Sequence, residues 1–368
     1  MKVAVVGCGA MGAAASWRLS KRGAEVVAFD RYSPPHDKGS THGDSRITRT
    51  AYLEGAFYVP LLQETFPMWR ELEAATGAEL LTMTGLLTLG ALGSPSIEAT
   101  LASAREHDLA VWTLDTADLR KLYPGHIVAD GEVGVLDAQA GFLRPEKAVE
   151  AMARGLDVRR NVVVNALVPE GDGVEVVTDA GRERFDAAVI AAGPWVRALL
   201  PWLPVTVERQ VMVWLAIAAD ESFAPSRFPV WLRQGAPEGD IYGFPTLDGR
   251  SIKLGGHHGG EAATPETVRR GVSDADLDPL RLFVTRHMRG VTRHVVKSAV
   301  CLYTNSPDEH FIVDLHPDSK RIVVLSPCSG HGFKFAPVMG DIAADLVLDG
   351  ATRRDISRFA LSRFAKTG

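Results

Sequence analysis

The first residues of the chain constrain its fold more than any other segment. Residues 2–6, KVAVV, form an apolar run rich in β-branched side chains that ends at Gly7, and this pattern predicts a buried strand. A helical pattern follows from Ala10 to Lys21, and residues 25–30, EVVAFD, predict a second strand. A strand, a glycine turn, a helix and a strand within about 30 residues predict a βαβ unit.

The glycines of this unit have the spacing of a dinucleotide-binding loop. Residues 7–12, GCGAMG, are a complete G-x-G-x-x-G. Gly7 permits the tight turn, Gly9 lets the backbone approach a pyrophosphate, and Gly12 lets the helix pack closely on the strand. Asp30 ends the following strand, where a carboxylate can bind a ribose hydroxyl. The motif therefore predicts a dinucleotide site but does not distinguish NAD from FAD.

Composition limits the class of protein. A chain of 368 residues with 46% hydrophobic content can bury the cores of two domains. The net charge of −5 comes without a run of lysine or arginine, so we expect neither nucleic acid nor an anionic membrane as a partner. No stretch approaches the roughly 20 apolar residues of a membrane span. We expect a protein of the reducing cytoplasm without a disulfide framework or zinc site, because the cysteines are odd in number and widely spaced: Cys8, Cys301 and Cys328.

Two later segments resemble the first unit in pattern. Residues 185–195 contain a buried strand, and residues 321–350 contain a strand, a glycine-rich loop and a terminal helix. Between them, alternating stretches such as VMVWLAI and SIKLGGH predict an antiparallel sheet with one covered face. We therefore predict an α/β fold in which a nucleotide-binding domain is interleaved with a substrate domain. The predicted limits are 1–80, 145–210 and 301–368 for the first domain, and 81–144 and 211–300 for the second.

Basic side chains in two distant segments indicate a site for an anion. Arg46 and Arg49 are three residues apart, so they can share one helical face and approach a carboxylate, although an ordinary solvated loop is the alternative. Lys334 follows glycines that should open the last helix, whose N-terminal amides favour an anionic acceptor such as a reduced flavin.

Three separated motifs resemble one family. PPHDKGSTHGDSRITRTAY at 34–52, SAVCLYTNSPDEHFIVDLHP at 298–317 and SGHGFKF at 329–335 are together similar to monomeric sarcosine oxidase and N-methyltryptophan oxidase. These enzymes are D-amino-acid-oxidase-like flavoproteins. The resemblance implies a Rossmann-like FAD-binding domain, a second α+β domain built on a largely antiparallel sheet, and a monomer. It also implies an FAD held covalently, through its 8α carbon, by the thiol of Cys301.

The resemblance further implies a role for each matching residue. Arg49 and Lys334 would hold the substrate carboxylate, and Tyr242 and Tyr303 would line the substrate pocket. Lys253 would activate oxygen on the other side of the flavin. The implied catalytic residues are His42, Ser45, Arg46, Lys253 and His257. The implied FAD contacts are Gly7, Gly9, Ala10, Met11, Gly12, Asp30, Arg31, His36, Ser40, Cys301, Gly330, His331, Gly332, Phe333 and Lys334.

Each of these assignments has an ordinary structural alternative. A strand lysine such as Lys253 is most often solvated, tyrosines such as Tyr242 and Tyr303 are often core aromatics, and Cys301 could be a packing residue between apolar neighbours. His257 belongs to no metal-binding motif, so we predict no metal. The segment 230–240 is expected to be a loop that brings Trp231 and Arg233 near the pocket.

The sequence thus predicts an FAD-dependent oxidase of secondary N-methyl amino acids, of the sarcosine or N-methyltryptophan type. The products would be formaldehyde, the primary amino acid and hydrogen peroxide. One alternative is a dehydrogenase that uses a protein or quinone acceptor, and another is an oxidase of pipecolate, proline or a fructosyl amino acid. A third, of another class, is a dinucleotide-binding protein without catalysis or an NAD-dependent enzyme.

Overall fold

The computed structural model describes residues 1–218 and 221–364. It begins with the predicted βαβ unit, formed by β1 (Lys2–Val6), α1 (Ala10–Lys21) and β2 (Glu25–Asp30). β1 and β2 are parallel, and β1 pairs along its whole length with residues 25–29 of β2. The prediction is confirmed residue by residue, because a buried strand, a glycine turn and an amphipathic helix each have a distinct pattern.

The βαβ unit is the centre of a sheet made from distant parts of the chain. Among the described residues, six strands form this sheet in the order β20-β21-β13-β1-β2-β9. The strands from β21 to β9 are parallel, and β20 is antiparallel to β21. This confirms that the segments 185–195 and 321–350 join the first unit. The added strands are β9 (Asp157–Arg160), β13 (Ala187–Ile190), β20 (Ile312–His316) and β21 (Ser319–Ser326).

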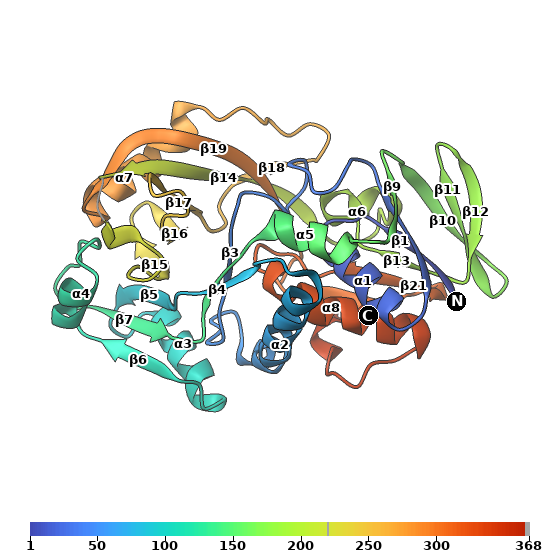
Figure 1. Cartoon of the computed structure of the whole chain (residues 1–368), viewed down its shortest axis with the longest axis horizontal. Coiled ribbons are helices and arrows are strands. Elements are labelled where there is room, and N and C mark those ends of the chain that lie inside the picture. Colours follow the sequence, from blue (N-terminus) through green and yellow to red (C-terminus); the bar gives the residue numbers. More distant parts are fainter. Residues whose placement is uncertain (219–220, 365–368) are drawn as a thin grey trace.

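Two layers cover the faces of this sheet (Figure 1). Val3 and Val5 of β1 pack with the helices, whereas Ala4 between them packs with a small antiparallel sheet, as the two-residue period of a strand requires. The helices are α1, α2 (Val59–Thr76), α5 (Pro145–Ala153) and α8 (Ala336–Leu348). The small sheet contains β10 (Val164–Glu170), β11 (Gly173–Thr178) and β12 (Gly181–Phe185).

A larger sheet forms the other half of the molecule. Among the described residues it has nine strands, in the order β18-β14-β17-β16-β15-β5-β7-β6 with β19 paired to β14. Every pair is antiparallel except β15 with β5, which confirms the predicted largely antiparallel sheet. Its strands are β5 (Leu86–Ala91), β6 (Val111–Leu114), β7 (Glu132–Asp137), β14 (Thr206–Ile217), β15 (Val230–Ala236), β16 (Gly239–Gly243), β17 (Ser251–Gly256), β18 (Glu261–Ala263) and β19 (Val291–Asn305).

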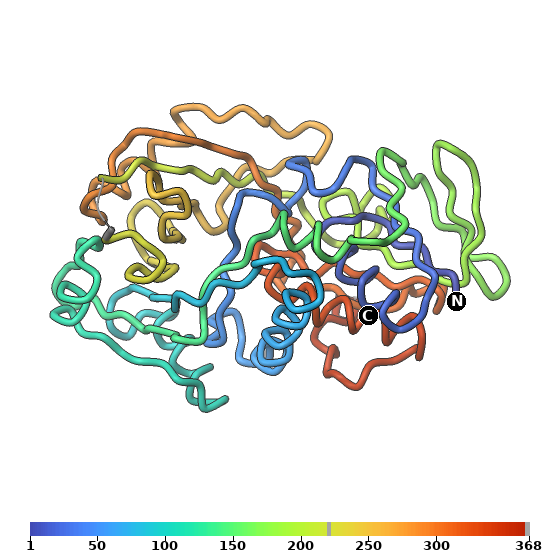
Figure 2. The backbone as a smooth tube through the Cα atoms, in the orientation of Figure 1, coloured from blue at the N-terminus to red at the C-terminus, as the bar shows by residue number. Residues whose placement is uncertain are grey.

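Helix α7 (Asp274–His287) covers one face of the large sheet. Its Leu280 and Phe283 share a core with Val213 and Leu254 of the sheet. The chain crosses between the two halves of the molecule several times (Figure 2). Strands β14 and β19 extend across the domain limits predicted at 210/211 and 300/301, and the division of the chain into two domains stays a prediction.

A second small sheet corrects one sequence interpretation. β3 (Arg46–Thr48), β8 (Gly141–Leu143) and β4 (Leu81–Met83) pair in the order β3-β8-β4. Arg46 and Arg49 therefore do not share a helical face: Arg46 lies in a strand opposite Leu143, and Arg49 follows that strand. A spacing of three residues is compatible with a helix but does not by itself exclude a short strand that tertiary pairing stabilises.

The remaining elements are short helices. Of the helices in residues 1–218 and 221–364, none is both long enough and apolar enough to cross a membrane. The α-helices not yet named are α3 (Pro95–Glu106), α4 (Thr116–Leu122) and α6 (Val196–Leu199). The 3-10 turns are η1 (Ala56–Tyr58), η2 (Gly193–Trp195), η3 (Glu221–Phe223), η4 (Phe333–Phe335), η5 (Ser357–Phe359) and η6 (Leu361–Phe364).

Candidate active site

A cavity of about 400 Å³ lies between the two large sheets. On one side it is lined by residues at the carboxyl ends of the parallel strands, including Gly7, Asp30, Ala191 and Leu325. This is where open parallel sheets bind ligands. On the other side it is lined by residues of the large sheet, including Lys253, which points away from the core under α7 because its neighbours in β17 point into that core.

The glycine loop is shaped for close backbone contact. Gly7 has a φ of 93°, and a Cβ there would lie 2.4 Å from the carbonyl oxygen of Ala191. A Cβ on Gly12 would lie 1.7 Å from the carbonyl oxygen of Gly7, so α1 can pack on β1 only with glycine at this position. Gly9 is the N-cap of α1 and provides no side-chain acceptor for the first-turn amides. The positive end of the helix dipole therefore faces the cavity.

Asp30 fixes the geometry of the same end of the cavity. Its carboxylate accepts hydrogen bonds from the backbone amides of Cys8 and Tyr32, both at 2.8 Å, and lies 3.3 Å from Nε2 of His36. The guanidinium of Arg31 lies 5.2 Å from the centre of the Trp195 ring. The predicted cofactor contacts Asp30, Arg31 and His36 thus line one end of the cavity.

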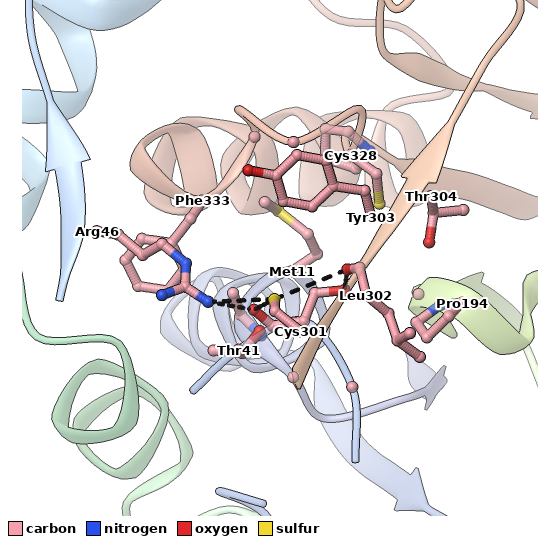
Figure 3. A pocket seen from close by; sticks show the side chains of 18 of the residues that line it. Met11, Thr41, Arg46, Pro194, Cys301, Leu302, Tyr303, Thr304, Cys328 and Phe333 are labelled. Atoms are coloured by element: carbon pink, nitrogen blue, oxygen red, sulfur yellow. Dashed lines mark hydrogen bonds between the residues drawn. The ribbon is translucent and has the colours of Figure 1, made fainter. Parts of the chain in front are cut away.

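Cys301 lines the cavity beside Arg46 (Figure 3). Its Sγ lies 3.5 Å from the carbonyl oxygen of Ser40 and 3.6 Å from Nη2 of Arg46. Arg46 donates from Nη2 to the Ser40 carbonyl at 2.7 Å and from Nη1 to the Ser45 carbonyl at 2.8 Å. The thiol is free and only 3% exposed. These bonds hold the loop after β2 against β19.

Lys253 is buried, which excludes the alternative of a solvated strand lysine. The residue is 2% exposed, and its Nζ donates to the carbonyl oxygens of Gly43 at 2.7 Å and Ser45 at 2.8 Å. The hydroxyl of Ser45 lies 3.4 Å from the same nitrogen. Burial and then the charge of Arg46 lower the pKa of Lys253 well below its ordinary value.

The far end of the cavity holds a buried arginine with free donors. Arg49 is 4% exposed, and its Nη2 forms an ion pair with the carboxylate of Glu54. Burial opposes ionisation of Glu54, but Arg49 then lowers the pKa of this carboxyl to about 2. Nε and Nη1 of Arg49 are buried and have no hydrogen-bond partner within the described chain. Buried donors are nearly always paired in proteins, so these two indicate a place for an anionic ligand.

Lys334 lies beside this arginine. Its Nζ donates to the carbonyl oxygen of His331 at 2.6 Å and to the hydroxyl of Tyr52 at 3.1 Å. The Tyr52 hydroxyl also lies 2.7 Å from Nδ1 of His331. Burial, followed by the charge of Arg49, lowers the pKa of Lys334 to about 7. Two basic groups therefore converge on one end of the cavity.

Tyr242, Tyr303 and His257 complete the wall of the cavity. The Tyr303 hydroxyl lies 3.4 Å from Nδ1 of His257. Burial lowers the pKa of His257 to about 3, so the imidazole is neutral at physiological pH. Glycine at 255 is required opposite Tyr242, because a Cβ there would lie 2.7 Å from the tyrosine hydroxyl.

Most of the predicted site residues line this one cavity, and two do not. Gly12 supports the fold of the loop, as described above. His42 is 6% exposed and lies outside the lining, and burial lowers its pKa to about 3. No group of three or more His, Cys, Asp or Glu side chains suited to a metal occurs in the part of the chain that the structure describes.

The prediction for residues 230–240 is wrong in two respects, the type of structure and the residues that face the cavity. This segment is a hairpin of β15 and β16 rather than a loop, with Leu232 opposite Tyr242. Trp231 packs against Phe283 of α7 at a ring distance of 5.7 Å, and Arg233 forms an ion pair with Glu132. Side chains alternate along a strand, so the intervening residues line the cavity instead: Leu232 and Gln234.

Sequence reasoning missed Tyr52 and Glu54. Both follow Arg49 closely in the chain, and a buried arginine requires a counter-charge. The nearest following acid, Glu54, supplies it. The need for a counter-charge could have identified Glu54 from the sequence. Tyr52 could not be identified in this way, because its contact with His331 joins segments far apart in sequence.

The cavity fits the FAD that the sequence predicts. One end has a glycine loop and a helix N-terminus that the N-cap residue Gly9 leaves open for a pyrophosphate, together with a fixed carboxylate, Asp30, beside it. The lining of the cavity also includes Cys301 and the two neighbouring basic residues, Arg49 and Lys334. A Cβ on Gly332 would lie 1.6 Å from the carbonyl oxygen of Pro327, so the loop before η4 also depends on glycine.

Known proteins resemble this chain over nearly its full length. Residues 2–346 match the family model described as FAD dependent oxidoreductase. A monomeric sarcosine oxidase of Streptomyces avermitilis is 36% identical, with 99% of this chain and 97% of that protein covered. An N-methyl-L-tryptophan oxidase of Yersinia pestis is 37% identical, with 98% of each covered. Among solved structures, NikD, an unusual amino acid oxidase essential for nikkomycin biosynthesis, has a TM-score of 0.86 at 27% identity and covers 97% of this chain and 96% of its own.

Proposed function

Because the chain belongs to the FAD dependent oxidoreductase family, we propose that it oxidises a secondary amino acid of the N-methyl type with dioxygen. One observation carries this proposal. Buried Arg49, whose Nε and Nη1 have no partner, lies beside Lys334 at one end of the cavity that fits FAD. Lys253 lies in the wall that the large sheet contributes to the same cavity. The proposed reaction converts R–NH–CH3, O2 and H2O into R–NH2, formaldehyde and H2O2.

The residues of the cavity have distinct parts in this reaction. FAD, held by the glycine loop of residues 7–12 and Asp30, would supply the two-electron acceptor for the N-methyl group and the reductant for dioxygen. Arg49 and Lys334 bind the substrate carboxylate and so fix the position of the amine. Neutral His257 adds no positive charge near that amine, which favours the uncharged amine that can be oxidised. No separate general base is required if the amine binds in this form.

Lys253 is assigned to the reduction of dioxygen. Negative charge that develops on oxygen next to Nζ raises the pKa of the lysine again, so the ammonium form is favoured at the moment when its charge is needed. The side chain is already held by two carbonyl oxygens, and little reorganisation is required.

We also propose that Cys301 holds the FAD through a thioether to its 8α carbon. The position of its thiol in the cavity wall supports this, since a purely packing cysteine needs no access to a ligand. Acid-precipitated protein should stay yellow and exceed the apoprotein mass by one FAD, and Cys301→Ser should lose both properties. Cys328→Ser is the matched control, because Cys328 lines the same cavity and should leave the link intact. A colourless wild-type pellet with FAD in the supernatant would contradict the covalent link.

The pKa of Lys334 predicts how substrate binding depends on pH. A carboxylate binds the ammonium form, and in the free enzyme this form is lost as pH rises through about 7. The affinity for methoxyacetate, which resembles sarcosine with oxygen in place of NH, should be constant below pH 7 and fall about tenfold per pH unit above it. Titration of flavin absorbance measures this. Lys334→Met should remove the pH dependence, and an unchanged profile in that variant would assign it to another group.

A substrate screen tests the proposed function itself. Purified holoenzyme should produce peroxide and formaldehyde with an N-methyl amino acid, and the screen would compare sarcosine, N-methyltryptophan, pipecolate, proline and fructosyl amino acids. Fast reduction of the flavin without peroxide, together with rapid turnover on a quinone, would instead establish a dehydrogenase.

Three further properties belong to the proposal. The cysteines Cys8, Cys301 and Cys328 are unpaired, which supports a reducing cytoplasmic location. We propose a monomer, which sedimentation at several concentrations would test. We also propose that the FAD-binding and substrate domains divide near residues 80, 145, 210 and 300, which limited proteolysis would test.

A further inference from the structure

A second cavity, which we call the outer groove, approaches Lys253 from the other side. It has a volume of about 530 Å³. Lys253 lines both the outer groove and the first cavity, so this lysine forms part of the wall between them. The other lining residues are Asp44, Arg144, Glu146, Lys147, Trp214, Pro245, Leu247, Asp248, Ser251, Val296 and Lys297.

A row of side chains across three strands connects the protein surface with Lys253. Trp214 in β14 lies directly opposite Lys253 in β17 and Lys297 in β19. The centre of its indole ring is 5.6 Å from Nζ of Lys253 and 4.4 Å from Nζ of Lys297. Lys297 is exposed and pairs with Asp44 at 2.9 Å. One aromatic side chain therefore lies between the buried Nζ of Lys253 and the exposed Lys297.

The chemistry of the groove suits a small uncharged molecule. Trp214, Pro245, Leu247 and Val296 contribute apolar surface to its wall. The charged lining residues have both signs: the acids Asp44, Glu146 and Asp248 and the bases Arg144, Lys147, Lys253 and Lys297. Mixed charges of this kind provide no strong field for an ionic ligand.

We propose that the outer groove is the entrance through which dioxygen reaches Lys253 and hydrogen peroxide leaves. This inference rests on the proposed function, in which Lys253 assists the reduction of dioxygen. It also separates the two substrates in space, since the amino acid would occupy the end of the first cavity near Arg49 and Lys334. In the overall reaction above, O2 takes up the two electrons removed from the substrate and two protons, and departs as neutral H2O2.

Bulky side chains at the mouth of the groove test this route. Val296→Trp and Leu247→Trp each add an indole to the groove from a different wall, and neither residue lines the first cavity. Both should lower the rate constant for reaction of the reduced enzyme with dioxygen several-fold and leave anaerobic reduction by substrate unchanged. His294→Trp is the matched control, because His294 is exposed on the same strand and lines neither cavity.

Xenon provides a measurement that does not depend on turnover. Crystals of the holoenzyme pressurised with xenon should show the gas beside Trp214 and Leu247, and Val296→Trp crystals should not. If both bulky variants react with dioxygen at the wild-type rate and no xenon enters the groove, dioxygen arrives by another path and the inference is wrong. If the reduced wild-type enzyme does not react with dioxygen at all, the proposed oxidase function fails, and the groove loses its assigned role with it.

Discussion

Lys253→Met is expected to slow the reaction of the reduced enzyme with dioxygen by about 100- to 1,000-fold, the loss typical when a preorganised charge-stabilising group is removed. Methionine has a similar length and volume, so the packing against Trp214 and Phe244 should survive. The charge is required only when negative charge develops on oxygen, and anaerobic reduction by the amino acid should therefore change little. Stopped-flow measurement of the two half-reactions separates these effects.

The control for this experiment is Lys320→Met. Lys320 is an exposed lysine near the start of β21 and does not line the cavity, so its replacement tests the effect of the substitution as such. Equal slowing of both half-reactions in Lys253→Met would indicate a structural role, through the bonds of Nζ to the Gly43 and Ser45 carbonyls. An unchanged reaction with dioxygen would favour the dehydrogenase alternative.

Local patterns predicted the nucleotide-binding part well. The limits of β1, α1 and β2 agree with the sequence prediction. A glycine turn separates the continuous apolar run of the buried strand from the 3.6-residue period of the helix, and these two patterns are clearly different. The glycine at 12 was predicted to allow close packing, and the 1.7 Å approach of a hypothetical Cβ to the Gly7 carbonyl oxygen shows why. These features depend on contacts within about 30 residues of sequence.

Features that depend on strand register were harder to predict. In the hairpin of β15 and β16, a shift of one residue exchanges the face toward α7 with the face toward the cavity. The sequence prediction treats this segment as a loop that brings Trp231 and Arg233 near the pocket, whereas Leu232 and Gln234 are the residues that line it. Composition does not resolve this choice, since each face carries both an apolar and a polar residue: Trp231 and Arg233 on one face, and Leu232 and Gln234 on the other.

The ion pair between Arg49 and Glu54 shows a different limit of prediction from sequence. Sequence analysis indicated an arginine for a carboxylate but not that Glu54 would already bind one edge of its guanidinium. Which donors remain free depends on the path of the loop after β3, and that path depends on contacts of Tyr52 with His331 from the other end of the chain. The free edge of the guanidinium became apparent only from the hydrogen-bond partners in the structure.

The unpartnered Nε and Nη1 of Arg49 predict a large effect of substitutions on the binding of carboxylate ligands. Arg49→Gln and Lys334→Met should each weaken binding of methoxyacetate by about 30- to 5,000-fold, which corresponds to the 2–5 kcal/mol lost when one partner of a buried charged pair is removed. Arg49→Gln should have the larger effect, because it also leaves the carboxylate of Glu54 without its cation and facing the ligand. Arg281→Gln is the control, since Arg281 pairs with two acids on the exposed side of α7.

Glu54→Gln distinguishes a ligand-binding arginine from a structural one. If Arg49 binds the carboxylate through Nε and Nη1, removal of the competing carboxylate should leave the affinity for methoxyacetate unchanged or increase it, since Arg49 keeps its charge. If Arg49 instead serves only to neutralise Glu54, then Arg49→Gln combined with Glu54→Gln should bind methoxyacetate as tightly as the wild type. Wild-type affinity in that double variant would show that the substrate carboxylate is held elsewhere. A remaining loss of about 30-fold or more, smaller than in Arg49→Gln alone because the Glu54 charge is gone, would assign the anion site to Arg49.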